Sequence, residues 1–311
     1  MELVDTYKLL ADESRLRLLA ILSKGYFNVQ ELTSILNLGQ STVSHHLKLL
    51  SNAGITEKHR EGTWTYYALN KEDSLVQQKI VANFLNVVTE TNGSSNLGKI
   101  INTDNTAIED LMSLRRSETK KFFESIAHNW EELRPEFSLE DTLIDLITNE
   151  IPDGSRLADL GCGSGAVLRR LLPRNGLTIG VDYSEAMLAK AKESLINTDS
   201  DLEFRLGYLE HLPIADESID QALAYMVLHH VPAPIEALNE VNRILVKNGK
   251  ILIVDLLPHN NDEMRERYGD RWLGFEPKEF HYWIEKCGFT CTNFEIFGEN
   301  KEVFFLTAKK K

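Results

Sequence analysis

Two carboxylates and three glycines stand at the ends of two consecutive apolar segments. Asp159 ends the first segment, and Asp182 ends the second, which covers residues 178–181. After Asp159, the run Gly161-Cys162-Gly163-Ser164-Gly165 places a glycine at every second position. Two strands that end in carboxylates, the first followed by a glycine-rich turn, predict the nucleoside-binding edge of an α/β sheet. The glycines allow a tight turn and a close ligand, and Asp182 can accept hydrogen bonds from both ribose hydroxyls.

The residue before the glycines indicates which nucleoside derivative binds. A Gly-x-Gly-x-Gly turn alone also suits dinucleotide enzymes, flavoproteins and tight structural turns. Asp159 would face a pyrophosphate with a carboxylate, which is electrostatically unfavourable. A ligand with an amino group at this place is favoured instead, and S-adenosylmethionine (SAM) has an ammonium where a dinucleotide has phosphates. Tyr183, next to Asp182, could lie against the purine face.

Two adjacent histidines are the candidate catalytic groups. His229 and His230 follow an apolar run that ends near Met226, and substrate-facing groups usually lie after a strand at this place. A neutral imidazole there could take a proton from a nucleophile, although methyl transfer often needs little more than alignment with the sulfonium methyl group. In the alternative interpretation, one histidine packs and caps the loop while the other faces the ligand.

Alternating strands and helices must position these groups. The apolar patterns predict strands at residues 156–160, 178–181, 202–206, 220–226, 250–256 and 303–308, and helices at 166–172, 184–195 and 234–245, with a further helix ending at 283–287. Such alternation is typical of an α/β fold with a doubly wound, mostly parallel sheet. We therefore expect a Rossmann-like domain in this part of the chain.

The N-terminal part has a different pattern. Asn28 can cap a helix over residues 29–36, and a glycine-containing turn leads to a second helix from Gln40 to about Asn52, which predicts a helix-turn-helix unit. Two β-rich runs follow at residues 55–60 and 63–69 and predict a wing. The polar residues expected to contact phosphates and base edges are Gln40, Ser41, Thr42, Ser44, His45, Lys48 and Arg60. The alternative is a small helical domain for packing or dimerisation.

The charge is distributed unevenly along the 311 residues. The net charge is −13, yet residues 1–70 hold seven basic and seven acidic residues, so the excess lies in the remainder. An acidic body repels nucleic acid, which restricts DNA contact to the N-terminal part. No apolar stretch reaches the roughly 18 residues of a membrane helix, and residues 1–5 do not begin a signal peptide. With three cysteines, of which Cys287 and Cys291 alone make no zinc site, we expect a cytoplasmic protein without a metal.

Residues 3–85 resemble the ArsR/SmtB family of winged-helix repressors, chiefly in segments 10–19 and 40–50. The resemblance implies a homodimer that binds double-stranded operator DNA, because these proteins read two half-sites with paired recognition helices. It also implies that a helix at residues 72–88 builds the dimer. The arsenic sensors of the family place cysteines at the start of the first helix of the motif. Residues 27–32 hold no cysteine here, so thiolate-based metal sensing is not expected.

Residues 120–311 resemble class I SAM-dependent methyltransferases in segments 159–165, 181–184, 212–214, 218–220 and 243–249. The resemblance implies that SAM, or its product S-adenosylhomocysteine (SAH), is held by Asp159, Gly161, Cys162, Gly163, Gly165, Asp182, Tyr183, Met187, Tyr208, Leu209 and Met226. It also implies an N-terminal lid at residues 122–130. In the ubiquinone-type branch, an aspartate after a glycine bonds the adenine amino group. Tyr208 stands at that place here, so adenine recognition is altered, although the Tyr208 ring could stack and the Leu209 amide could reach adenine.

The sequence thus predicts three segments. Residues 1–90 form a winged-helix DNA-binding and dimerisation domain, residues 91–105 a polar linker, and residues 106–311 a methyltransferase domain. Two functions of different classes fit this arrangement. In the first, a DNA-binding regulator, a repressor by resemblance, also methylates a small molecule. In the second, the methyltransferase fold is a sensor without catalysis, in which SAM or SAH changes the affinity for the operator.

Overall fold

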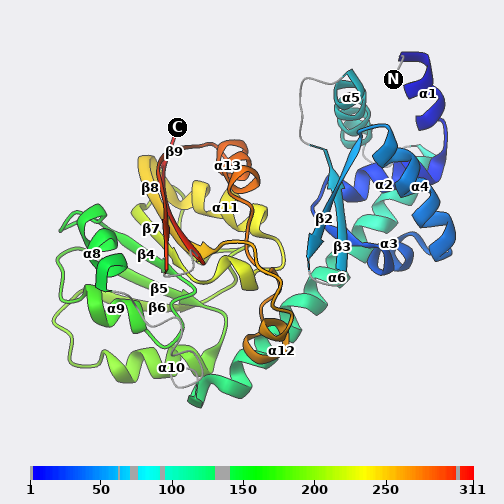
Figure 1. Cartoon of the computed structure of the whole chain (residues 1–311). Helices are drawn as coiled ribbons and strands as arrows, with labels where there is room; N and C mark the ends of the chain where they lie inside the picture. Colours follow the sequence, from blue (N-terminus) through cyan, green and yellow to red (C-terminus); the bar gives the residue numbers. More distant parts are fainter. Residues whose placement is uncertain (1–2, 62–63, 71–75, 92–94, 130–140, 299–301) are drawn as a thin grey trace. The chain divides into compact units, whose positions relative to one another are not determined.

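The structure is a computed structural model that describes residues 3–61, 64–70, 76–91, 95–129, 141–298 and 302–311. The chain divides into two compact units, Met1–Leu114 and Arg115–Lys311. Figure 1 shows the first unit in blue to cyan and the sheet of the second in green to red. The first unit contains a three-stranded sheet and the second a seven-stranded sheet. Within the described ranges, no helix has the length and apolar character needed to cross a membrane.

The first unit begins as a winged helix-turn-helix domain. Its elements are α1 (Leu3–Leu10), α2 (Glu13–Leu22), β1 (Phe27–Asn28), α3 (Val29–Leu36), α4 (Gln40–Asn52), β2 (Thr56–Glu61) and β3 (Trp64–Leu69). Asp12 caps α2 by accepting a hydrogen bond from the Arg15 amide, and Asn28 and Glu31 form a capping box at the start of α3. The antiparallel strands β2 and β3 make the wing. The helix-turn-helix unit and the wing are therefore confirmed.

Two longer helices follow, α5 (Val76–Thr91) and α6 (Asn96–Ile126). The predicted linker at 91–105 differs from the structure, because most of this segment belongs to α6. Asp104 is 2% exposed and accepts hydrogen bonds of 2.7 and 2.6 Å from the Arg17 guanidinium. Burial and this ion pair override the weak helix propensity of the asparagines and threonines in the segment. The division between the units falls after Leu114 instead.

The second unit is a doubly wound α/β domain. Its strands are β4 (Leu157–Leu160), β5 (Thr178–Asp182), β6 (Leu202–Leu206), β7 (Ile219–Tyr225), β8 (Leu245–Leu256), β9 (Phe289–Phe297) and β10 (Val303–Lys310). They form one sheet in the order β6-β5-β4-β7-β8-β10-β9. The first five run parallel, and β10 pairs antiparallel with β8 and β9. The expected mostly parallel sheet is confirmed.

Strand β9 is the one strand of this sheet that the sequence did not predict. It lies at the edge of the sheet, and polar residues alternate with Phe289, Phe294 and Ile296 along it. An edge strand with one half-exposed face lacks the continuous apolar run of the buried strands. The periodicity therefore gives a weaker signal at this edge.

Helices cover both faces of the seven-stranded sheet. They are α8 (Asp141–Glu150), α9 (Ala166–Leu171), α10 (Glu185–Ser194), α11 (Pro234–Ile244), α12 (Glu263–Tyr268) and α13 (Pro277–Lys286), with short 3-10 helices η1 (Ala127–Asn129) and η3 (Leu228–His230). Figure 1 shows α8, α9 and α10 on one side of the sheet and α11 and α13 on the other. Because β4 lies between β5 and β7, the chain switches direction across the sheet at β4. Ligands of open α/β sheets bind at the carboxyl ends of strands around such a point.

Candidate functional site

The turn after β4 is bound tightly to the end of β5. The Asp182 carboxylate accepts hydrogen bonds from the amides of Gly163, at 2.9 Å, and Ser184, at 2.8 Å. Gly161 has a φ of 69°, and a Cβ built there would lie 2.2 Å from Cγ2 of Val227. A side chain is therefore excluded at this position by both the backbone conformation and the contact.

The same turn leaves room for a ligand beside a buried carboxylate. A Cβ built on Gly163 meets no atom within 4 Å. Asp159 is 2% exposed, and its Oδ2 atom has no hydrogen-bond partner among the described residues. A buried carboxylate oxygen without a donor is costly, and a ligand that brings a donor offsets this cost. The turn thus combines open space with a demand for a positively charged or N–H group.

Burial changes the acidity of both carboxyl groups. It raises the pKa of Asp159 to about 7, an effect to which the negative charge of Asp182 adds. It also raises the pKa of Asp182 to about 6, although the backbone hydrogen bonds to this carboxylate act in the opposite direction. Both shifts express how poorly two carboxylates are stabilised in this site without a cation. The ammonium and ribose hydroxyls of SAM fit this set of acceptors, since a carboxylate that accepts two amides has further lone pairs.

A cavity next to the turn lies at the carboxyl edge of the sheet. Its walls include Tyr183, Tyr208 and Leu209, which are predicted nucleoside contacts, and Arg116 and Thr119 from the C-terminal part of α6. The rings of Tyr183 and Tyr208 are nearly parallel, at 6°, with centroids 5.9 Å apart. The Arg116 guanidinium lies 5.9 Å from the centroid of the Tyr208 ring. The structure therefore brings three of the predicted nucleoside contacts together around one cavity.

The end of α6 packs beside this cavity. Phe123, Ala127 and Met187 form a small apolar cluster. The Phe123 ring meets the edge of the rings of Tyr183, at 6.0 Å, and His230, at 4.8 Å. Part of the segment expected to be a lid thus contacts the predicted nucleoside site, whereas Trp130 lies outside the described residues.

The remaining predicted SAM-binding residues surround the turn and the end of β7. Gly165 starts α9 with a φ of 81°, and Cys162 is buried beneath the turn, where burial raises the pKa of its thiol well above the usual value. Met226 follows β7 with a φ of 51°, and its amide donates to the Val254 carbonyl at 2.7 Å. Such a left-handed conformation is uncommon for a residue with a side chain, and it turns the chain toward the two histidines.

The two histidines have different surroundings. His229 is fully buried, and its Nδ1 lies 2.7 Å from Oδ1 of Asp255. Its backbone carbonyl accepts hydrogen bonds from the amides of Arg271 and Trp272, both at 2.9 Å. His230 lines the cavity, and its Nδ1 lies 3.1 Å from the Gly269 carbonyl. A carbonyl requires a donor, so the Nδ1 of His230 carries the proton and Nε2 is an acceptor in the neutral ring.

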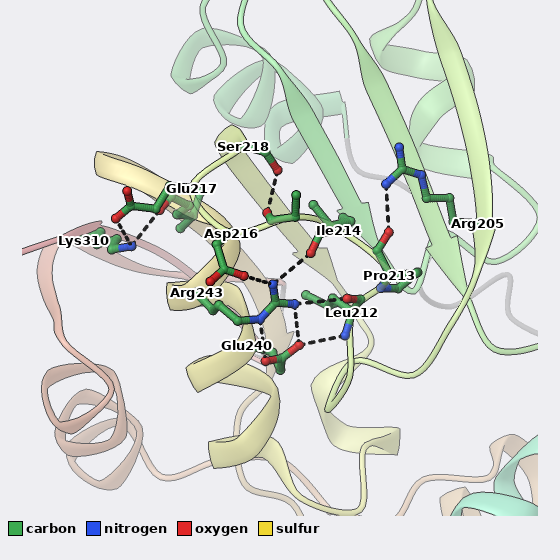
Figure 2. Close-up of polar contacts among 12 residues, drawn as sticks. Arg205, Leu212, Pro213, Ile214, Asp216, Glu217, Ser218, Glu240, Arg243 and Lys310 are labelled. Carbon is green, nitrogen blue, oxygen red and sulfur yellow. Dashed lines mark hydrogen bonds and ion pairs between the residues drawn. The ribbon is translucent and has the colours of Figure 1, made fainter.

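A half-buried arginine holds the segment that follows Tyr208 and Leu209. Figure 2 shows Arg243 between Glu240 and the chain from Leu212 to Asp216. Its guanidinium donates to the carbonyls of Leu212, at 3.1 Å, and Ile214, at 2.9 Å, and pairs with Asp216 and Glu240. Glu240 in turn accepts from the Leu212 amide at 2.9 Å, and its hydrogen bond raises the pKa of Arg243. These bonds fix the segment directly after Tyr208 and Leu209, the residues predicted to contact adenine.

The charged residues of the cavity wall, Arg116 and Glu210, are among those that were not predicted. Arg116 lies on an amphipathic helix whose pattern does not reveal which unit it contacts. Glu210 directly follows Tyr208 and Leu209 in the chain, and this position was the available sequence signal that it belongs to the site. Charged residues near a binding motif are usually solvent-exposed, so their burial is decided by the tertiary structure.

The predicted DNA-binding residues lie on the outer face of α4. Val43, Leu47 and Leu50 of this helix are fully buried in the core of the first unit. The polar residues on the remaining face are all exposed, namely Gln40, Ser41, Thr42, Ser44, His45 and Lys48. Arg60 belongs to strand β2, and its side chain lies outside the described residues. The six side chains of α4 thus form one polar surface on the second helix of a helix-turn-helix unit, where base contacts usually fall.

Comparisons with known proteins agree with these two units. Residues 12–58 match the family model described as "bacterial regulatory protein, arsR family". Residues 158–253 match the family model described as "methyltransferase domain". A chain of the solved complex between the Haloferax volcanii Trm112 methyltransferase activator and a methyltransferase superposes with a TM-score of 0.53 at 19% identity, covering 60% of this chain and 96% of that chain. The chain therefore contains a segment that matches the arsR-family regulator model and a second unit with the fold of class I methyltransferases, within which the methyltransferase-domain model matches.

Curated relatives match parts of the chain. It is 32% identical over 108 residues to an arsenite methyltransferase of Halobacterium salinarum, covering 33% of this chain and 28% of that protein. It is 29% identical over 150 residues to a ubiquinone biosynthesis O-methyltransferase of Hahella chejuensis, covering 46% of this chain and 62% of that protein. The matches thus span less than two thirds of either relative.

Proposed function

We propose that the protein is a DNA-binding repressor whose second unit binds SAM and methylates a small molecule. The observation that carries this proposal is the buried Asp159 carboxylate beside the open glycine turn. In the proposed complex the SAM ammonium pairs with Asp159, the ribose hydroxyls donate to Asp182, and Tyr183 lies beside adenine. Bound SAM would supply an electrophilic methyl group on its sulfonium.

His230 is the residue that we propose takes the proton of the methyl acceptor. It lines the cavity and has an acceptor nitrogen in the neutral tautomer that Gly269 selects. His229 acts through position, because its ring bonds to Asp255 and its carbonyl holds the chain at Arg271 and Trp272. Of the two histidines, His230 is thus the better base.

The proposed acceptor is an oxygen or nitrogen nucleophile rather than arsenite. Arsenite binds thiolates, and burial raises the pKa of the Cys162 thiol and brings that of Cys287 to about 11. Cys291, the third cysteine, lies on β9. The name of the ubiquinone relative indicates O-methylation, which is compatible with His230 as the base.

Calorimetry with SAM and SAH tests the ligand, and conversion of SAM to SAH tests the reaction. We expect both ligands to bind the wild-type protein, and turnover to appear with phenolic or amine acceptors but not with arsenite. His230→Ala should lower the turnover while keeping SAH affinity. If neither SAM nor SAH binds, the proposed function is refuted.

We further propose that the α4 surface binds operator DNA as part of a homodimer. The exposed apolar residues Leu3, Val4 and Tyr7 of α1 and Val87 of α5 support an interface between two copies. Duplexes selected from a randomised library by the full chain would give the operator. A dyad-symmetric sequence and a dimer in sedimentation experiments are the expected results, and a monomer bound to a single half-site would contradict them.

A specific observation also supports the sensor function. Helix α6 contributes Asp104, the partner of Arg17, to the first unit and contributes Arg116 and Phe123 to the surroundings of the cavity in the second. One continuous helix therefore carries a buried ion-pair partner of the first unit and residues around the cavity of the second. A ligand that changes the conformation of α6 would change operator affinity by the roughly 5- to 150-fold that is typical of allosteric coupling.

A variant with a destabilised α6 helix tests the sensor function separately from catalysis. Ser113 and Leu114 are exposed, so replacing both by glycine weakens the helix without removing a buried contact. If SAM or SAH regulates DNA binding, the double variant should keep its affinity for the ligand and its affinity for the operator. It should lose most of the effect of the ligand on operator binding. Equal operator affinity of the wild-type protein with and without ligand would exclude the sensor function.

A further inference from the structure

Glu210 is a buried carboxylate in the cavity wall that the proposed function has not used. It is 3% exposed, and its Oε1 atom has no hydrogen-bond partner in the described part of the chain. Leu209 and Tyr208, the adjacent residues of the adenine-side loop, line the same cavity. A buried acceptor without a donor is costly, so its presence here calls for a ligand that supplies an N–H group.

The surrounding protein holds Glu210 in place and leaves its Oε1 atom without a donor among the described residues. The His211 amide donates to the Tyr208 carbonyl at 3.1 Å and closes a tight turn around Glu210. Beyond the turn, Leu212 is fixed by Glu240 and Arg243. The nearby cation, Arg116, faces the ring of Tyr208 and makes no hydrogen bond to Glu210 among the described residues. The loop that carries Glu210 is therefore held in place, and its Oε1 atom is available to a ligand.

We propose that Glu210 accepts the hydrogen bond of the adenine amino group and so determines that the site takes adenine rather than another purine. The inference rests on the proposed binding of SAM. The edge of adenine presents one acceptor, N1, and one donor, the N6 amino group. The Leu209 amide can serve the acceptor, and the Glu210 carboxylate serves the donor.

The neighbouring side chain is poorly suited to this task. Tyr208 stands where an aspartate would bond the amino group, but its ring packs parallel to that of Tyr183 and faces Arg116. A phenol is also a weaker acceptor than a carboxylate. The loop thus retains a carboxylate on the same cavity, two positions further along the chain. Burial raises the pKa of Glu210 and Arg116 opposes that shift, so the cation favours the ionised acceptor form.

The test compares SAH with S-inosylhomocysteine, in which a carbonyl replaces the adenine amino group. Full-length protein is titrated with each ligand by calorimetry. The wild-type protein should prefer SAH by at least about 30-fold, because the carbonyl would face a carboxylate and leave it without a donor. Glu210→Gln should reduce this preference to about threefold or less, since a side-chain amide can present either a donor or an acceptor.

Two comparisons keep the assignment falsifiable. Glu236→Gln removes an exposed carboxylate near Glu210 that does not line the cavity, and it should keep the full preference for SAH. Equal affinity of the wild-type protein for both ligands would overturn the assignment without any variant. A Glu210→Gln variant with the wild-type preference would overturn it as well, while leaving SAM binding intact. If the wild-type protein binds neither ligand, the proposed function itself fails.

Discussion

The proposed DNA-binding surface and the proposed nucleoside site use polar side chains in opposite ways. On α4, six polar residues from one continuous stretch are exposed around a core of Val43, Leu47 and Leu50. In the second unit, Asp159, Asp182 and Glu210 come from three separate segments, and each is at most 6% exposed. The side chains of the first surface are exposed to water. The second site keeps carboxylates away from water, where backbone amides donate to Asp182 and a ligand is proposed to supply the donors for Asp159 and Glu210.

This difference predicts different responses to solution conditions. Contacts to phosphates release counterions, so binding through α4 should weaken with salt. Buried carboxylates with raised pKa values should instead make ligand binding sensitive to pH. Four experiments test this contrast.

The largest effect is expected for Asp159→Asn. The variant keeps the shape of the side chain and removes the charge that pairs with the ligand ammonium, so affinity for SAM and SAH should fall by about 100-fold, or ~3 kcal/mol. The apo protein should melt at the same or a higher temperature, because an unpaired buried carboxylate is removed. Asp220→Asn is the control, since Asp220 pairs with Arg156 and its loss should lower stability but spare ligand affinity. Unchanged SAH affinity in Asp159→Asn would contradict the proposed site.

A charge reversal on α4 should have the next largest effect. Lys48→Glu places a carboxylate on the exposed surface of the recognition helix, and we expect about 30-fold weaker operator binding and a smaller dependence on salt. Lys24→Glu makes the same charge change at an exposed position between α2 and β1. If both variants lose equal affinity in fluorescence anisotropy, net charge rather than the α4 surface governs DNA binding.

Ligand affinity should change by about tenfold with pH. The pKa of Asp159 is about 7 in the folded apo protein, so the ammonium meets an ionised partner only as the pH rises, and SAH should bind more tightly at pH 8 than at pH 6. The stability of the protein without ligand should instead decrease as the pH rises. A folded pKa above the unfolded value of about 3.9 contributes stability that is present at low pH and is lost as the pH rises through about 7. Calorimetry and thermal melting measure the two trends, and both should flatten in Asp159→Asn.

The smallest effect is expected for Arg243→Lys. A lysine cannot make the forked hydrogen bonds to Glu240 and the loop carbonyls, so the adenine-side loop should be held less firmly. We expect about threefold weaker SAH binding and a loss of ~1–2 kcal/mol in urea unfolding. Arg170→Lys, at an exposed pair with Asp141, should change neither. A larger loss of ligand affinity than in Asp159→Asn would reverse the order proposed here.

Local sequence signals predicted most of the elements that carry these sites. The caps at Asp12 and Asn28, the glycine turn and the apolar periods are short-range features, and the structure follows them closely. The predicted linker differs because burial of Asp104 against Arg17, which is 87 positions away, decides that helix. Strand β9 was missed because it lies at the sheet edge, beyond its partner β10, and lacks the continuous apolar run of the buried strands.

The sequence by itself determined the two fold types, the glycine turn and the polar face of α4, because each depends on residues close together in the chain. Only the tertiary structure decided which polar groups become buried. It separated His229, enclosed beside Asp255, from His230 at the cavity, and it left Oδ2 of Asp159 and Oε1 of Glu210 without protein donors among the described residues. Burial and hydrogen bonding of these groups depend on contacts between strands and loops that are far apart in the sequence. A local sequence pattern does not specify such contacts.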